Sequence, residues 1–169
     1  MEFLEKHLEQ IILESDVTKL QERGLYIFDE NTKIKSQVNI GNYGIADLIL
    51  FNRPTRIYRG MIKVVELKKG KLNIDAFLQA VRYLRGIKSY LEKREIEHTY
   101  DFNITLIGSE VVQTDFCYLS SVFDDLWGPL NFHHVTTDSY TSIDMYSYKY
   151  KIDGIYFKRE SYSLLDEGF

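Results

Sequence analysis

Two short aliphatic runs interrupted by charged residues constrain the fold of this chain most. The first run covers residues 45–51 (IADLILF) and the second covers residues 62–69 (IKVVELKK). Runs of this length and composition are typical of buried β-strands, in which an unpaired charge is costly to bury. Because side chains alternate along a strand, Glu66 and Lys68 share one face, and Val65 and Leu67 point to the other. If the two strands pair, Asp47 joins Glu66 and Lys68 on their face.

Two carboxylates and an ammonium at the end of a small sheet favour a site for a hard divalent cation with a water molecule beside it. Oxygen ligands of this kind predict Mg²⁺ or Mn²⁺ as the cofactor. A plain surface strand with alternating charges is the alternative interpretation of the same residues.

A helix is predicted from Ile74 to about Lys93, with Asn73 as its cap and an apolar stripe along one side. Gln79 and Tyr83 lie one helical turn apart on this helix and therefore share a face. A pair on the helix surface, or a tyrosine in the core, is the alternative interpretation of these two residues.

These motifs resemble the PD-(D/E)xK nuclease superfamily, which has an Asp on one strand and Glu-x-Lys on the next. Here the motifs are Asp47 and Glu66-Leu67-Lys68, and residues 44–49 (GIADLI) resemble the family's Gly-x-x-Asp-Leu strand. Gln-x-x-x-Tyr on the following helix, here residues 79–83, is similar to the RecB-like and NucS-like branch. The resemblance covers roughly residues 5–91, and Ala46 replaces the proline that the family often has before its Asp.

The resemblance implies an α/β fold with a restriction-endonuclease-like core, in which helices flank a central mixed β-sheet. The length of the chain predicts one domain over residues 1–169, with a core in residues 1–110 and a C-terminal extension in residues 111–169. The implied catalytic residues are Asp47, Glu66, Lys68, Gln79 and Tyr83. The implied metal ligands are Asp47, Glu66, the main-chain carbonyl of Leu67, and Glu5, with Glu2 and Glu9 as competing first-helix candidates. The expected nucleic-acid contacts are Gln37, Lys69, Arg82 and Arg85.

The function implied by the resemblance is a Mg²⁺- or Mn²⁺-dependent deoxyribonuclease that hydrolyses phosphodiester bonds in DNA. The rival is a non-catalytic domain that binds nucleic acid or protein and keeps the same fold. RNA as a substrate and a homodimer as the assembly both stay open. The net charge of −4 opposes DNA binding in general, but basic residues gather around the predicted site, in residues 53–63 and 68–88.

Composition favours one soluble domain without a membrane partner. The 169 residues contain no apolar run near 18 residues, and the first residues are acidic and amphipathic, unlike a signal peptide. The single cysteine, Cys117, excludes an internal disulfide and fits a reducing compartment. The expected location is the cytoplasm.

The remaining patterns predict the other elements of the chain. Apolar spacing predicts a helix over residues 2–14, and β-rich runs predict strands at 25–28, 34–40 and 102–107. Asp153-Gly154 predicts a hairpin between strands at 143–150 and 155–158. A short helix is predicted at 117–126 and a strand at 132–136, and the adjacent His133 and His134 point to opposite sides of that strand. The sheet is expected to have four or five strands, with the helix from Ile74 packed on Val65 and Leu67.

Overall fold

The computed structural model describes residues 5–116 and 141–160. Its elements in chain order are α1 (Glu5–Glu14), α2 (Val17–Glu22), β1 (Lys33–Asn39), the 3-10 turn η1 (Gly41–Tyr43), β2 (Ile45–Asn52), β3 (Gly60–Leu67), β4 (Lys71–Leu72), α3 (Ile74–Glu92), the 3-10 turn η2 (Glu97–Thr99), β5 (Tyr100–Gly108), β6 (Glu110–Val111), β7 (Thr141–Lys151) and β8 (Gly154–Glu160).

The fold is α/β, built on a six-stranded mixed sheet with the order β1-β2-β3-β5-β7-β8. The first three strands form an antiparallel meander, β3 and β5 are parallel, β5 and β7 are parallel, and β8 returns antiparallel to β7. A small parallel pair, β4 and β6, lies beyond the end of this sheet. The expectation of a central mixed sheet flanked by helices is confirmed. The expected number of strands was too low because β7 and β8 belong to the same sheet.

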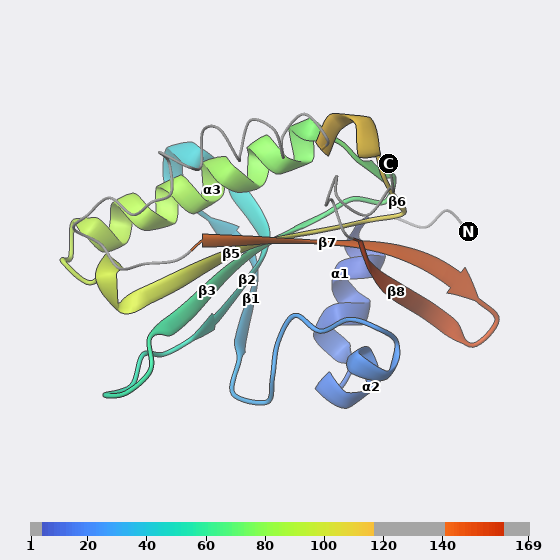
Figure 1. Ribbon diagram of the computed structural model, residues 1–169, viewed down its shortest axis with the longest axis horizontal. Helices are drawn as coiled ribbons and strands as arrows, with labels where there is room; N and C mark the ends of the chain where they lie inside the picture. Colours follow the sequence, from blue (N-terminus) through green and yellow to red (C-terminus); the bar gives the residue numbers. More distant parts are fainter. Residues whose placement is uncertain (1–4, 117–140, 161–169) are drawn as a thin grey trace, which may run out of the picture.

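Helices cover the two faces of the sheet unequally (Figure 1). The long helix α3 lies along one face, while α1 and α2 lie on the other face toward one end. We call these the α3 face and the α1 face. Each face has its own apolar cluster: Val64, Phe77 and Leu106 belong to the first, and Leu8, Val65 and Tyr146 belong to the second. Because α1 and α2 are short, the rest of the α1 face is available to loops and polar side chains.

The predicted contact of α3 with Val65 and Leu67 is wrong. Both side chains are buried in the cluster of the α1 face, together with Leu8 and Ile12. The alternate residues of β3, Ile62 and Val64, pack under α3 instead. The period of two was correct, but periodicity alone does not say which of two apolar faces meets a given helix.

Strands β1 and β2 both exchange faces at the level of Gln37 and Asp47. Ile34 packs on the α1 face, whereas Val38, four residues later, packs on the α3 face. The same change separates Leu48 on the α1 face from Ala46 on the α3 face. Gln37 has a φ of 48°, a left-handed conformation that is uncommon for a residue other than glycine. The regular alternation of side chains between the two faces is therefore broken in both β1 and β2, next to Asp47.

The strand predicted at 25–28 is also wrong. These residues form an irregular segment after α2, in which Leu25 and Ile27 are buried while Tyr26 is 65% exposed. The alternation of buried and exposed residues is real, but it comes from a loop that packs on the α1-face cluster. Within the described residues this segment is not part of any strand, so the alternation alone does not make a β-strand.

The predicted C-terminal extension is an integral part of the sheet as far as the structure describes it. The hairpin at Asp153-Gly154 is confirmed, because Lys151 pairs with Gly154 and the glycine has a φ of 139°. The predictions for Cys117, for the helix at 117–126, and for His133 and His134 in a strand at 132–136 lie outside the described residues. No described helix is long and apolar enough to cross a membrane.

Candidate active site

Asp47 and Glu66 lie on neighbouring antiparallel strands, as predicted. Strand β2 pairs with β3 so that Leu48 is opposite Val65, and Asp47 continues this register toward Glu66. The Oδ2 atom of Asp47 accepts a hydrogen bond of 2.8 Å from the main-chain N–H of Leu67. This bond fixes the Asp47 carboxylate against the end of β3.

Glu66 is a buried carboxylate with only one of its oxygens satisfied. Its side chain is 1% exposed, and its Oε1 atom lies 2.7 Å from the ammonium of Lys68, which is 27% exposed. Its Oε2 atom is buried and, within the described residues, accepts no hydrogen bond. A carboxylate oxygen in this state is costly, since buried polar atoms are nearly always paired.

The electrostatics of the site favour a bound proton or cation. Burial raises the pKa of Glu66 to about 7, against the lowering effect of Lys68. Burial also raises the pKa of Asp47, and the charges of Glu5 and Glu9 add to the effect. Burial by itself would lower the pKa of Lys68, but the hydrogen bond and charge of Glu66 outweigh it and raise that pKa. Negative charge is therefore concentrated here beyond what Lys68 neutralises.

The acidic edge of α1 lies against the ends of β1 and β3. The Oε1 atom of Glu5 accepts a bond of 3.3 Å from the main-chain N–H of Lys69. One helical turn later, Oε2 of Glu9 accepts a bond of 2.9 Å from the side chain of Gln37. Gln37, expected to contact nucleic acid, is thus exposed but bonded to a helix carboxylate. Glu2, the other first-helix candidate, lies outside the described residues.

Gln79 and Tyr83 form a pair on α3, with the Gln79 amide donating a bond of 2.6 Å to the Tyr83 hydroxyl. Tyr83 is 2% exposed and belongs to the α3-face cluster. A Cβ placed on Gly44 would lie 2.9 Å from the Tyr83 ring, so the ring packs directly on the backbone three residues before Asp47. The structure therefore shows Tyr83 as a core residue that supports the start of β2.

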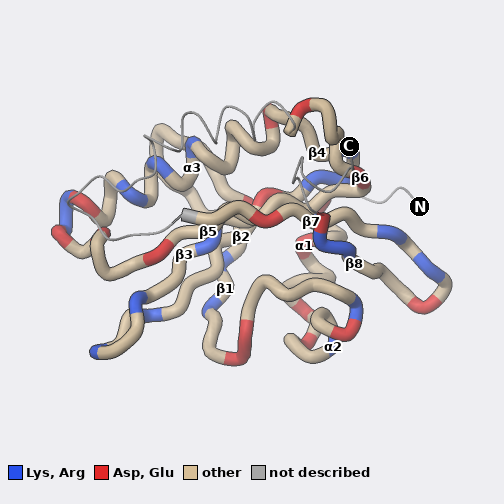
Figure 2. The backbone as a smooth tube through the Cα atoms, viewed as in Figure 1, with Lys and Arg blue, Asp and Glu red and all other residues tan. Residues whose placement is uncertain are grey.

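Arg82 and Arg85 are both exposed on α3. The guanidinium of Arg82 lies 5.7 Å from the centre of the Tyr83 ring. Other basic positions follow α3 and gather at the far end of the β2–β3 hairpin (Figure 2). The basic residues expected to reach phosphates are therefore accessible, in spite of the overall negative charge.

Asp47 and Glu66 are suited to hold a divalent cation, and Glu5 is less well suited. The unsatisfied Oε2 atom of Glu66 and the fixed carboxylate of Asp47 are hard oxygen donors, the type that Mg²⁺ and Mn²⁺ prefer. Yet in the part of the chain that the structure describes, no group of three or more His, Cys, Asp or Glu side chains is arranged to hold an ion. Glu5 therefore does not complete a three-carboxylate cluster with Asp47 and Glu66.

One residue near the site was missed by sequence reasoning. The hydroxyl of Tyr148, on β7, donates a bond of 2.7 Å to the main-chain carbonyl of Lys69. This bond ties the segment after Glu66 and Lys68 to a strand 79 positions later in the chain. Tyr148 is one of 13 tyrosines, and no local pattern distinguishes it from the others.

Comparisons with known proteins leave the site to be interpreted from its geometry. No protein-family model, no curated protein and no solved structure matches this chain. The six-stranded α/β fold and the contacts among Asp47, Glu66 and Lys68 are thus the basis for assigning a function.

Proposed function

We propose that this protein is a metal-dependent nuclease that hydrolyses phosphodiester bonds in DNA, on a restriction-endonuclease-like core. One observation carries the proposal: Glu66 is buried with an unsatisfied oxygen, next to a fixed Asp47 and a bonded Lys68. Burying this much charge without a function would be unfavourable. A cation at Glu66 Oε2 would satisfy the one buried side-chain oxygen that lacks a hydrogen bond in the described structure.

Asp47, Glu66 and the main-chain carbonyl of Leu67 are the groups that would hold Mg²⁺ or Mn²⁺. When bound, such a cation lowers the pKa of an attacking water and polarises the scissile phosphate. The bond from the Leu67 N–H holds the Asp47 carboxylate beside the end of β3. The pairing of β2 with β3 and the hydrogen bond from Leu67 to Asp47 thus support the proposed set of ligands.

Lys68 has two tasks in this proposal. Its ammonium holds the buried Glu66 carboxylate in position at 2.7 Å. An ammonium has three N–H donors, so donors remain for a phosphoryl oxygen as negative charge develops on it. The 27% exposure of the Lys68 side chain gives a substrate access to these donors.

The substrate groove is proposed to run along α3. Arg82 and Arg85 are exposed there, and guanidinium groups suit phosphate oxygens. Lys69 follows the site directly, and its exposed side chain is placed to reach a flanking phosphate. Gln79 and Tyr83 support the groove from within, since Tyr83 is buried and its hydroxyl accepts the Gln79 bond.

The test combines metal binding with cleavage. Calorimetric titration with Mn²⁺ should show binding to the wild-type chain and none to Asp47→Ala. A panel of labelled single-stranded, duplex and branched DNA should be cleaved with Mg²⁺ or Mn²⁺ by the wild type only. Asp75→Ala is the matched control, because Asp75 is an exposed acidic residue in the first turn of α3 and should behave as wild type.

A different result would support the rival function. If the wild-type chain binds labelled DNA but neither binds Mn²⁺ nor cleaves any member of the panel, the proposal fails. The non-catalytic nucleic-acid-binding domain is then the better description of the protein.

A further inference from the structure

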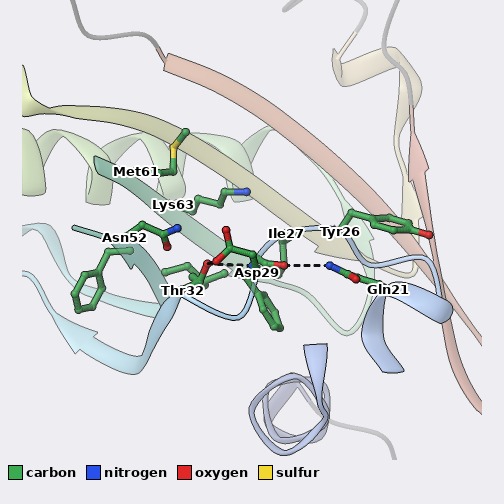
Figure 3. Close-up of a pocket in the computed structure, with 11 residues that line it drawn as sticks. Gln21, Tyr26, Ile27, Asp29, Thr32, Asn52, Met61 and Lys63 are labelled. Carbon is green, nitrogen blue, oxygen red and sulfur yellow. Dashed lines mark hydrogen bonds between the residues drawn. The ribbon is translucent and has the colours of Figure 1, made fainter. Parts of the chain in front are cut away.

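A recess that includes neither Asp47 nor Glu66 lies beside the α1 face of the sheet (Figure 3). It has a volume of about 320 Å³ and lies between the irregular segment after α2 and strands β2 and β3. Small-molecule sites commonly begin at about 300 Å³. The recess is therefore large enough for one small ring system.

Lys63, on β3, provides the charge of this pocket. Its side chain is half-buried, and Figure 3 shows it extending across the recess. Within the described residues its ammonium forms no hydrogen bond or ion pair. Burial lowers the pKa of Lys63, and the charges of Asp144 and Asp29 oppose this lowering only in part. Of those two carboxylates, Asp144 is already paired with Arg159 and bonded to Asn103.

Asp29 presents a fixed carboxylate to the same pocket. Its Oδ1 atom accepts bonds of 2.9 Å from the Asn31 N–H and 3.0 Å from the Thr32 hydroxyl. Burial is the largest single effect and raises the pKa of Asp29, but the hydrogen bonds from Thr32, Asn31 and the Asn52 side chain together outweigh it and lower that pKa. Asp29 therefore remains ionised, in one orientation, with acceptor capacity on its second oxygen.

The opposite charges of Lys63 and Asp29 narrow the class of ligand. Asp29 would repel an anion and Lys63 would repel a cation, so the pocket favours neither a simple anion nor a simple cation. A neutral ligand that accepts from the ammonium and donates to the carboxylate is favoured instead. Tyr26 and Phe28 also line the recess, and aromatic rings offer flat apolar surfaces for a planar ligand.

We propose that this pocket binds a single unpaired keto nucleobase of the guanine or uracil type. Such a base is planar and neutral, and it carries a carbonyl oxygen beside a ring N–H on one edge. Lys63 donates to the carbonyl and Asp29 accepts from the ring N–H. The base of adenine carries an amino group where the keto bases carry the carbonyl, so it places a donor against the ammonium.

The experiment is a calorimetric titration of the metal-free chain with guanosine, uridine and adenosine. Guanosine and uridine should bind, and adenosine should bind at least about tenfold more weakly, on the scale of one hydrogen bond to a charged group. Lys63→Met and Asp29→Asn should each weaken guanosine binding by about tenfold or more. Lys149→Met, a change at an exposed lysine that does not line the pocket, should leave it unchanged.

Several results would overturn the proposal. Equal binding of adenosine and guanosine, displacement of guanosine by inorganic phosphate, or no nucleoside binding at millimolar concentration would each do so. Asp29→Asn keeps the test valid if Lys63→Met does not fold, as checked by circular dichroism. A short single-stranded oligonucleotide with one guanine distinguishes the sources: tighter binding than guanosine indicates a base within a strand, and equal binding indicates a free nucleoside.

This inference is separate from the proposed nuclease activity. The titration uses no metal and no cleavage, and Lys63 lies on the face of β3 opposite to Glu66. Asp47→Ala should therefore bind guanosine as well as wild type does, even if the nuclease proposal fails.

Discussion

Lys63 on strand β3 and Lys68 directly after this strand have opposite environments. Lys68, next to Glu66, is bonded to a buried carboxylate, and its pKa is raised. Lys63, five residues earlier and on the other face, is half-buried without a hydrogen bond in the described structure, and its pKa is lowered. The difference teaches that burial alone does not set the state of a lysine. A counter-charge within bonding distance decides whether the ammonium is stabilised or destabilised.

The largest expected difference between the two lysines is in the rate of DNA cleavage after each is replaced. Lys68→Ala should cut DNA cleavage by about 10²-fold or more, because it removes a donor that stabilises developing charge. Lys63→Ala should cleave within about twofold of wild type, since Lys63 lies on the opposite face. Single-turnover rates with saturating Mn²⁺ measure both. Equal rates for Lys68→Ala and wild type would show that Lys68 has no catalytic role.

The next effect is on stability, and replacing Lys68 should cost more stability than replacing Lys63. Lys68→Met should lower the free energy of unfolding by about 1–2 kcal/mol, because it leaves the buried Glu66 carboxylate without its partner. Lys63→Met should change it by less than about 1 kcal/mol, or raise it, since an ammonium that is costly to bury is removed. Urea unfolding at pH 7 measures both changes. A larger loss for Lys63→Met than for Lys68→Met would reverse the comparison.

A further effect follows from the raised pKa of Glu66. The folded chain holds the proton of Glu66 more tightly than the unfolded chain does, and this difference stabilises the folded state. The stabilisation is complete below pH 4.5, the ordinary pKa of the group, and is lost as the pH rises to about 7. The metal-free wild type should therefore lose stability between these pH values relative to Glu66→Gln. Thermal unfolding at a series of pH values, without divalent cations, measures the difference. Parallel curves for the two proteins would show that Glu66 titrates normally.

The smallest expected effect concerns whether bound DNA follows α3 or the β2–β3 hairpin. Replacing Arg82 and Arg85 together with alanine should weaken DNA binding similarly for unrelated sequences and flatten its salt dependence by about two phosphate contacts. The matched control replaces Arg53 and Arg56, which are exposed on the β2–β3 hairpin. Binding measured at several salt concentrations distinguishes the two. If only the Arg53 and Arg56 variant changes the slope, the DNA follows the hairpin and not α3.

The part of the site that follows from strand periodicity could be predicted from the sequence. Asp47 and Glu66 are on adjacent strands, and Lys68 reaches Glu66, because neighbouring strands joined by a short loop usually pair. The face that meets α3 could not be predicted, because Val64 and Val65 are equally apolar and the choice depends on where two separate helices pack.

The polar pocket could not be predicted either. Lys63 looks like an ordinary charged residue on a strand, and its surroundings come from the segment around Asp29 and from β7, far away in the chain. Residues 25–28, directly before Asp29, were predicted as a strand, but the structure shows an irregular segment in which Leu25 and Ile27 are buried and Tyr26 is exposed. Pairing with a neighbour, which periodicity does not report, is what separates a strand from such a loop.

The strand order also bears on how the protein folds. The strands that carry Asp47 and Glu66 pair locally, with Leu48 opposite Val65, whereas Phe102 pairs with Thr141, 39 positions later. Contacts between distant parts of a chain form more slowly than local contacts. The β1–β2–β3 meander is therefore expected to form first, before β7 and β8 dock. During synthesis, the two carboxylates can be brought together while residues 141–160 are still in the ribosome, and the bond from Tyr148 to Lys69 is made only afterwards.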